Sequence, residues 1–376
     1  MQRTIYFDYA SLVPPVPEAI EAMRHAAETM WGQPGALHSI GGRALYALDT
    51  ARRQVADYLG TTPQEVVFTS SGREALAVGF TEALARLPAD ATIASSRLEH
   101  PALQQLVEGA AASGYTVHWL TLPGGAPTEA DRDAIRSASL VALSTCNHEL
   151  GTSLLSALGE AAPTALRVID AVQSAPWISL AVLNDERTFY ALSGAKLGAT
   201  MGIGALRVPS RIFYEARNAG RHLERESPPW LAAIGLGAAC AAREGRRDEL
   251  LATACARADE LLAALRTIAP ALLVNGALDT RLGPVLNLSF PGQYGKSLVA
   301  ALSLYGICIS HTAACQARRS EYSPVVRAAY ASEPERAVGA TRWSVSERVT
   351  SEDIACAVSA LKKILAPVKN GEASTT

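Results

Sequence analysis

Lys196 stands out because lysine is rare in this chain and because its neighbours are small and apolar. The sequence has five lysines, and Lys196 is the only one before residue 296. It lies in FYALSGAKLGATMGIGALRV, residues 189–208, between two apolar runs typical of strands. Burial disfavours the ammonium form of a lysine, and a neutral amine can form a Schiff base with a carbonyl. Lys196 is therefore the candidate nucleophile, although a lysine that extends from a strand end toward water would show the same pattern.

Polar residues also follow other apolar runs. The turn 69–74, TSSGRE, joins a predicted strand to a predicted helix, so its N–H groups can hold an anion or Ser71 can simply cap the helix. Asp170 ends the run LRVID, and Gln173 lies three residues later. An acid at that place can pair with a protonated ring nitrogen or cap the next turn.

Three further residues suit chemistry at a flat, charged ligand. His100, in LEHPAL, can stack on a ring or move a proton, although a single histidine is more often structural. Arg342, in ATRWS, has a planar fork that suits a carboxylate, and a structural ion pair is the common alternative. Cys315 lies in a polar stretch with two arginines, where a thiol tends toward the reactive thiolate. An amine, an anion cradle, an acid and an imidazole together fit pyridoxal 5'-phosphate, an aromatic aldehyde with a phosphate and a ring nitrogen.

Composition limits the kind of protein. At 376 residues the chain is long enough for two domains, and 49% of its residues are hydrophobic. A net charge of −2 without blocks of like charge makes nucleic acid and anionic membranes unexpected partners. The absence of a leader-like or spanning apolar run predicts a cytoplasmic protein. The cysteine spacing matches no metal template, and the cysteines other than Cys315 are interpreted as small hydrophobic residues: Cys146, Cys240, Cys255, Cys308 and Cys356.

Apolar and amphipathic runs alternate over the first two-thirds of the chain, which predicts an α/β fold with a mostly parallel sheet covered on both faces. The predicted strands are Glu65–Thr69, Thr92–Ser95, Thr116–Leu120, Leu140–Thr145, Leu166–Asp170, Phe189–Ser193 and Ile203–Val208. Helices are predicted at Ala44–Leu59, Arg73–Ala85 and Pro101–Ala112. Ligands of such sheets bind at the carboxyl ends of the strands, where the polar residues described above fall.

A different pattern follows residue 212. Helical sequence covers 228–267, and a helix is predicted at Ser351–Leu365. The predicted strands between them are Ala271–Asn275, Val285–Ser289, Ile307–Ser310 and Thr341–Ser346. We therefore expect a large domain over residues 13–250 and a smaller α+β domain, built from 1–12 and 251–376, that carries Cys315.

In their order, these motifs resemble those of the NifS/IscS-type cysteine desulfurases, which are fold-type I pyridoxal-phosphate enzymes of the class V aminotransferase group. The similarity is carried by IYFDYASLVPP, HSIGGRALYALDTARRQVADYLG, EVVFTSSGREA, LEHPAL, CNHELGT, IDAVQS, SGAKLGATMGIGAL, HTAACQA and TRWSVS. The resemblance implies a seven-stranded, mostly parallel sheet in the large domain. It also implies a homodimer with sites near the subunit interface, and a reaction that converts L-cysteine to L-alanine.

The resemblance implies a role for each motif residue. Lys196 would hold the cofactor as a Schiff base and move the Cα proton, with His100 stacked on the ring and assisting. Arg342 would bind the substrate carboxylate, and Cys315 would take the sulfur as a persulfide for an acceptor protein or a small thiol. The other implied cofactor contacts are Asp170 at the ring nitrogen, Gln173 at the ring hydroxyl, Ser71, Gly72, Arg73 and Ser193 at the phosphate, and Ser227 of the partner subunit at the same phosphate.

The chain departs from the family pattern around the cofactor. Ala195 stands where the family has a histidine, Arg73 replaces a threonine, and His148 replaces an asparagine that contacts the ring. We hypothesise that Arg73 binds the phosphate in place of the missing imidazole, and that His148 contacts cofactor and substrate. Two alternatives to a desulfurase follow from these departures. One is a divergent enzyme of the same group, such as a C–S or selenocysteine lyase or another amino-acid-transforming enzyme, and the other is a weakly active sulfur-transfer scaffold.

Overall fold

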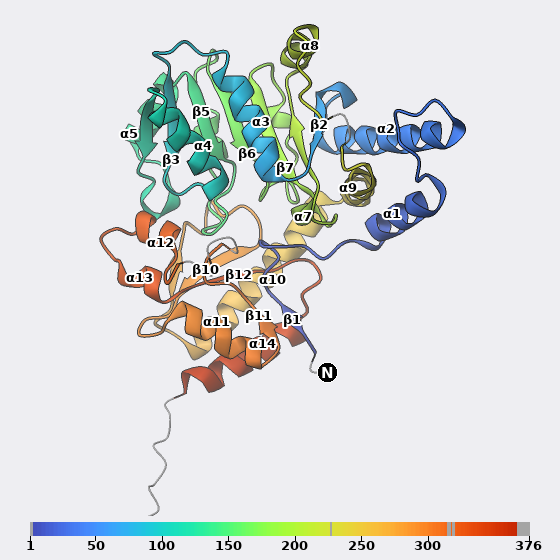
Figure 1. The fold of residues 1–376 in the computed structure, drawn as a ribbon. Helices are drawn as coiled ribbons and strands as arrows, with labels where there is room; N and C mark the ends of the chain where they lie inside the picture. Colours follow the sequence, from blue (N-terminus) through green and yellow to red (C-terminus); the bar gives the residue numbers. More distant parts are fainter. Residues whose placement is uncertain (1–2, 226–227, 314–316, 318–319, 367–376) are drawn as a thin grey trace, which may run out of the picture.

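A seven-stranded sheet forms the centre of the larger part of the molecule (Figure 1). The computed structural model describes residues 3–225, 228–313, 317 and 320–366. Its sheet has the order β2 (Val66–Thr69), β8 (Gly204–Arg207), β7 (Thr188–Ser193), β6 (Leu166–Asp170), β5 (Leu140–Ser144), β3 (Thr92–Ser96) and β4 (Thr116–Leu120). Strand β8 is antiparallel to both of its neighbours and the other pairs are parallel. The predicted mostly parallel, seven-stranded sheet is therefore confirmed.

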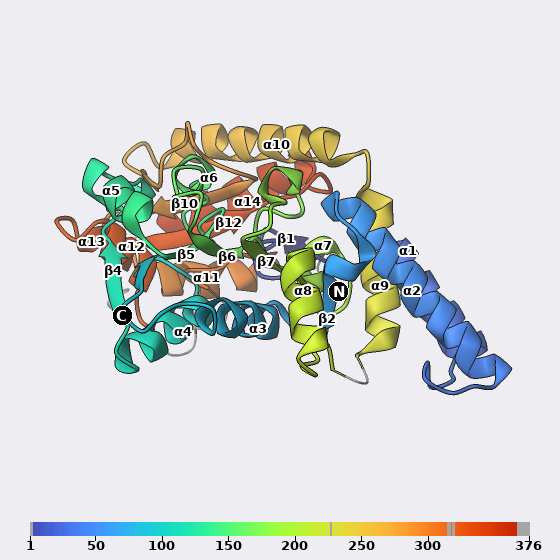
Figure 2. The same ribbon diagram turned by 90° about the horizontal axis from the view of Figure 1, so that it is seen from above.

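Helices cover both faces of this sheet because successive side chains of a strand point to opposite faces. Along β5, Leu140 and Ala142 pack in one hydrophobic cluster with α3, α4 and α8, and Val141 and Leu143 pack in another with α1, α2 and α9. Figure 2 shows α3, α4 and α8 along one side of the molecule. The helices of this part are α1 (Pro17–Thr29), α2 (Ser39–Leu59), α3 (Gly72–Leu84), α4 (Pro101–Ala112), α5 (Glu129–Ser137), α6 (Leu155–Leu158), α7 (Gly194–Leu197), α8 (Ser210–Asn218) and α9 (Trp230–Arg243).

The smaller part joins the start of the chain to its last third. Strands β12 (Ala340–Ser344), β10 (Val285–Ser289) and β9 (Leu273–Asn275) form an antiparallel sheet, and β1 (Ile5–Tyr6) pairs in parallel with β11 (Ile307–Cys308). Phe7, Leu261 and Trp343 share one buried cluster here. The helices are α10 (Arg247–Ile268), α11 (Gly295–Leu304), α12 (Pro324–Ala329), α13 (Glu335–Val338) and α14 (Ser351–Leu365). The domain limits at 12/13 and 250/251 stay a prediction.

The predicted helical stretch 228–267 is confirmed. It consists of two helices, α9 and α10, because Gly245 between them takes a left-handed φ of 71° that interrupts a right-handed helix. One expectation needs correction. Cys356, interpreted as a small hydrophobic residue, is exposed on α14, whereas Cys146 and Cys240 are buried and Cys255 and Cys308 are partly buried. An alanine-rich helix shows too little contrast between its faces for the sequence to tell which side is covered.

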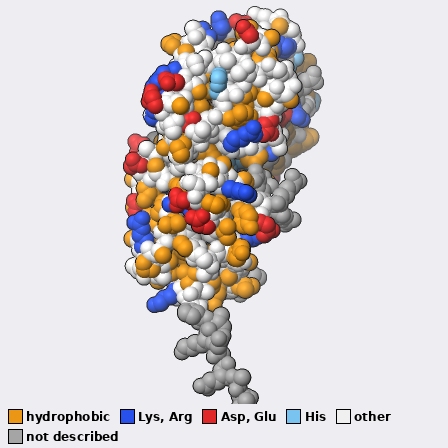
Figure 3. All heavy atoms as spheres, turned by 90° about the vertical axis from the view of Figure 1, so that its left-hand side faces the viewer, with side chains coloured by type: hydrophobic (Ala, Val, Ile, Leu, Met, Phe, Trp, Pro, Cys, Tyr) orange, Lys and Arg blue, Asp and Glu red, His pale blue; other side chains and the backbone are white. Residues whose placement is uncertain are grey.

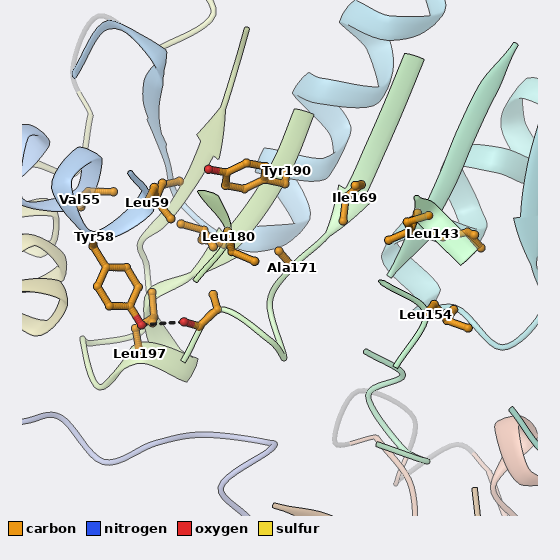
Figure 4. Packing of buried hydrophobic residues seen from close by; sticks show 14 of the residues in the cluster. Val55, Tyr58, Leu59, Leu143, Leu154, Ile169, Ala171, Leu180, Tyr190 and Leu197 are labelled. Atoms are coloured by element: carbon orange, nitrogen blue, oxygen red, sulfur yellow. Dashed lines mark hydrogen bonds between the residues drawn. The ribbon is translucent and has the colours of Figure 1, made fainter. Parts of the chain in front are cut away.

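A hydrophobic cluster packs between helix α2 and the central sheet. Val55 and Leu59 of α2 lie beside Tyr190 of the sheet, and Ile169 and Leu143 continue the cluster across β6 and β5 (Figure 4). The hydroxyl of Tyr58 donates to the carbonyl of Ala175 at 2.6 Å, which satisfies the polar end of a buried aromatic ring. Helix α2 is thereby tied to the turn that follows β6.

The surface carries charges of both signs. On the face shown in Figure 3, acidic and basic side chains are interspersed among apolar ones. Among the residues that the structure describes, no helix combines the length and the apolar character needed to cross a bilayer.

Candidate active site

A cavity of about 280 Å³ lies at the carboxyl ends of the central strands. Its wall contains the predicted site residues that fall within the described part of the chain: Ser71, Gly72, Arg73, His100, His148, Asp170, Gln173, Ser193, Lys196 and Arg342. The predicted residues Cys315 and Ser227 lie outside the described residues. The tertiary structure thus brings together side chains from distant parts of the sequence.

Lys196 reaches the cavity from α7, a single turn that follows β7 directly. Gly194 starts this turn, where a Cβ atom would lie 2.4 Å from Cγ2 of Ile203, so the turn can pack this closely only with glycine. The Nζ atom of Lys196 donates to the backbone carbonyl of Ser11. The N-terminal segment therefore helps to hold the amine.

The turn 69–74 caps the helix that follows it. Ser71 caps α3, since its Oγ accepts from the N–H of Glu74 at 3.2 Å, and Ser71 also lines the cavity. A Cβ atom at Gly204 would lie 2.4 Å from the carbonyl carbon of Ser71. The backbone of β8 therefore supports the turn directly, and the first N–H groups of α3 are available to an anion.

Arg73 lies on the rim of the cavity rather than inside it. Its side chain is exposed, and NH1 donates to Oε1 of Gln105 on α4 at 2.9 Å. The hypothesis that Arg73 binds a phosphate requires the guanidinium to exchange this neutral partner for an anion, which is favourable for an arginine.

Asp170 and Gln173 lie at the end of β6. Asp170 is 8% exposed, and burial raises its pKa to about 6, while the N–H of Val172 donates to Oδ1 at 3.0 Å. Nε2 of Gln173 donates to the carbonyl of Ala10 at 3.0 Å. A nearby cation would favour the charged carboxylate of Asp170, so this acid is suited to a cationic ring nitrogen.

His100 and His148 meet in the cavity wall. Their ring centroids are 5.2 Å apart with a T-shaped arrangement, and burial lowers the pKa of each imidazole to about 3. Nδ1 of His100 accepts the N–H of Ala102 at 3.1 Å, so the neutral ring carries its proton on Nε2. His100 can therefore donate a hydrogen bond from Nε2, whereas its Nδ1 is already engaged.

Arg342 is held by the protein on several sides. NH2 donates to Oδ1 of Asp8 at 2.9 Å and to Oγ of Ser11 at 2.6 Å, and NH1 donates to the carbonyl of His148 at 2.9 Å. Nε is buried without a hydrogen-bond partner among the described residues. The structural ion pair, the common alternative to a ligand-binding role, is therefore present, and a buried N–H next to the cavity remains for a further acceptor.

Several residues of the site were missed from the sequence. The carbonyl of Ser11 accepts from Lys196, and the carbonyl of Ala10 accepts from Gln173. Ser144 lines the cavity from the end of β5, and Cys146 lines it from the turn that follows. The polar side chains of Asp8 and Ser11 in an otherwise apolar N-terminal segment were the available signal. Backbone carbonyls leave no signal, because every residue has one.

Comparison with known proteins agrees with this architecture. The model of the family described as aminotransferase class-V matches residues 5–356. The chain is 30% identical to a cysteine desulfurase of Trichormus azollae, over 98% of this chain and 96% of that one. It is 28% identical to the cysteine desulfurase NifS of Azotobacter vinelandii, over 97% and 94%.

Solved structures show the same fold. A NifS-like protein superposes with a TM-score of 0.83 at 22% identity, covering 96% of this chain and 99% of its own. The apo structure of a cysteine desulfurase from Thermococcus onnurineus NA1 superposes with a TM-score of 0.80 at 20% identity, over 96% and 94% of the two chains. The family match covers nearly the whole chain and includes every strand of the central sheet. The chain belongs to the class-V aminotransferase family.

Proposed function

We propose that the protein is a pyridoxal-phosphate-dependent cysteine desulfurase that converts L-cysteine to L-alanine and receives the sulfur on Cys315. The observation that carries the proposal is the convergence of Lys196, Asp170 and His100 on one cavity beside the start of α3. The names of the relatives found by sequence support the choice of substrate.

The residues present fit the cofactor. Gly72 leaves the start of α3 without a side chain. A Cβ atom there would be crowded, since it would lie 3.1 Å from Cγ2 of Val172 and 3.3 Å from Cβ of Ser193. The N–H groups of this helix start would hold the phosphate, and Asp170 would hold the proton of the ring nitrogen. Ser144, which lines the cavity, adds a buried hydroxyl to the wall. Lys196 would anchor the aldehyde carbon.

When bound, pyridoxal phosphate supplies an electron sink for the bonds around the substrate Cα atom. Lys196 would move the Cα proton, because its Nζ lies in the cavity wall and a neutral amine is a base. His100 would offer the N–H of Nε2 as a hydrogen-bond donor to the bound cofactor or substrate. Arg342 would orient the substrate carboxylate through its remaining N–H.

Cys315 would complete the reaction as the sulfur acceptor. The C–S bond of the substrate breaks, an S–S bond forms at Cys315, and the carbon skeleton leaves as alanine. The terminal sulfur of the persulfide would then pass to an acceptor protein or to a small thiol.

We also propose a homodimer formed through α1, α2 and the segment between them. These elements extend from one side of the molecule (Figure 2) and expose large apolar side chains, with Trp31 at 64%, Tyr46 at 68% and Leu37 fully exposed. Exposed apolar groups gathered on a projecting pair of helices favour a protein partner, and the resemblance implies that this partner is a second copy. Light scattering of the purified protein should give twice the mass of the chain, and a Trp31→Glu, Tyr46→Glu variant should give the mass of one chain.

The decisive experiment compares the wild type with Cys315→Ala. The wild type, loaded with pyridoxal phosphate, should change its visible absorbance on addition of L-cysteine and release alanine. The variant should keep the spectral change but lose the persulfide and nearly all sulfide release. A C–S lyase would keep its sulfide release in the variant, and a scaffold would show neither the cofactor absorbance nor the change.

A further inference from the structure

A tight turn follows β5 and presents a buried carboxylate, Glu149. The side chain of Asn147 holds this turn, because its Oδ1 accepts from the N–H groups of Glu149 at 3.0 Å and Leu150 at 2.9 Å. Its Nδ2 donates to the carbonyl of Leu98 at 2.8 Å. The direction of Glu149 is therefore determined by the turn itself.

The carboxylate of Glu149 binds two separate segments of the chain. Oε1 accepts from Oγ1 of Thr312 at 2.7 Å and from the N–H of Ala313 at 3.0 Å, and Oε2 accepts from Oγ of Ser323 at 2.5 Å. Glu149 is 1% exposed, so these hydrogen bonds replace its contacts with water. Hydrogen bonds to a buried charge are among the strong ones in proteins.

These donors stand on both sides of the stretch that contains Cys315. Ala313 is two residues before Cys315 and lines the cavity, and Ser323 is eight residues after it. Nε2 of His311 and the carbonyl of Ser320 are 3.3 Å apart and add a second tie across the same stretch. One carboxylate thus binds the chain on both sides of this stretch.

The same turn also contacts Arg342, the residue that would bind the substrate carboxylate. His148 lines the cavity, and its carbonyl accepts from NH1 of Arg342. The carbonyl of Glu149 accepts from Nδ2 of Asn287 on β10 at 3.3 Å. The turn therefore sets the distance between Arg342 and the ends of the stretch that carries Cys315.

We propose that Glu149 is a positioning residue that places Cys315 for sulfur removal and has no part in the binding of L-cysteine. The inference rests on the proposed function. It predicts that binding and sulfur transfer respond differently to the loss of the Glu149 carboxylate. Misplacement of a reacting group by about 1 Å can lower a rate about a hundredfold, whereas binding of the substrate to the cofactor and Arg342 needs no contact with Glu149.

The test uses the holoenzyme with the substitution Glu149→Gln. An amide keeps the size of the side chain, but Ser323 Oγ already accepts from the N–H of Val326 and would lose the acceptor of its own proton. The spectral dissociation constant for L-cysteine should stay within about twofold of the wild type. The rate of Cys315 persulfide formation in a single turnover, measured by alkylation and mass spectrometry, should fall about 10- to 100-fold.

A matched control is Glu65→Gln. Glu65 is also buried, and its Oε1 accepts from Arg207 NH2 at 3.0 Å and from the N–H and Oγ of Ser210 at 3.1 and 2.8 Å. It stands before β2, at the opposite end of that strand from the turn 69–74. Loss of this carboxylate should lower the free energy of unfolding. It should leave the spectral dissociation constant for L-cysteine and the rate of Cys315 persulfide formation unchanged.

Substitutions of Thr312 test the same contact from the other side. Thr312→Val should lower the rate of persulfide formation, and Thr312→Ser, which keeps the hydroxyl, should restore it.

A wild-type rate in Glu149→Gln would overturn the inference, as would equal losses of binding and of persulfide formation. If Glu149→Gln does not fold, a wild-type rate in Thr312→Val overturns it instead. Absence of a Cys315 persulfide in the wild type would remove the proposed function itself, which is visible before any variant is measured.

Discussion

The guanidinium of Arg342 donates to the carboxylate of Asp8 at 2.9 Å, although 334 residues separate the two along the chain. Asp8 follows the N-terminal strand β1, and Arg342 lies in the middle of β12. Oδ2 of Asp8 also accepts from Oγ of Ser310 at 3.0 Å. This pair therefore joins the beginning of the chain, the strand β12 and the segment that leads to Cys315.

Substitution of Arg342 by glutamine should destabilise the cofactor-free protein by about 3–5 kcal/mol, because it leaves the carboxylate of Asp8 without its cation in a largely buried place. Urea unfolding measures this change. The double variant Asp8→Asn, Arg342→Gln should lose less than the sum of the single variants, with a coupling of about 1–3 kcal/mol. Additive losses would mean that the pair does not act as a unit.

Replacement of Gly204 by alanine should weaken both stability and cofactor binding. The new Cβ atom would lie 2.4 Å from the backbone of Ser71, so the turn at the start of α3 must move. We expect a loss of about 1–3 kcal/mol in unfolding free energy and a higher dissociation constant for pyridoxal phosphate.

The control is Gly109→Ala. Gly109 lies in α4, and a Cβ atom there meets nothing within 4 Å. Alanine should stabilise this helix by about 0.5–1 kcal/mol and leave cofactor binding unchanged. If Gly204→Ala bound the cofactor as tightly as Gly109→Ala does, the support of the turn by β8 would have no functional role.

Cofactor binding should weaken below about pH 6 because of Asp170. Burial raises the pKa of this acid to about 6, and the protonated acid cannot pair with a cationic ring nitrogen. Asp170→Asn should bind pyridoxal phosphate about 10- to 100-fold more weakly at pH 7.5, as expected for the loss of one charged hydrogen bond. Titration by absorbance between pH 5 and pH 8 should show that the difference between the two proteins shrinks as the pH falls. A constant difference would argue against this role.

The pH dependence of stability should report the buried histidines. Burial lowers the pKa of His148 from 6.5 to about 3, so the unfolded chain binds a proton between these values and the folded chain does not. The contribution of His148 to the unfolding free energy should therefore fall as the pH decreases below about 6.5, by up to about 1.4 kcal/mol per pH unit. Burial raises the pKa of Glu99 to about 8 and that of Asp170 to about 6, and these two acids contribute with the opposite sign. The informative quantity is therefore the difference between the wild type and a variant without His148.

His148→Asn removes one of the two buried histidines. The unfolding free energy of the wild type minus that of the variant, from urea titrations between pH 4 and pH 7, should decrease as the pH falls. Equal slopes in His148→Asn and the wild type would show that His148 is not buried in its neutral form.

Local pattern was enough to predict the central sheet and much of the site. The strands β4 and β6 and the helices α4 and α14 have the predicted bounds, because buried strands and amphipathic helices show their period directly in the sequence. Lys196, Asp170 and the turn 69–74 were identified because polar residues at strand ends contrast with their apolar neighbours.

The contacts that complete the site depend on the folded chain. The pairing of Asp8 with Arg342, the carbonyl of Ser11 at Lys196, and the carboxylate of Glu149 at Thr312 all join segments far apart in the sequence. No period or neighbour marks such partners, since each is selected by how the two parts of the molecule pack. The residue types and their order along the chain thus determine the strands and the candidate chemistry, and the packing of the N-terminal segment and the last third of the chain against the sheet decides which atoms meet.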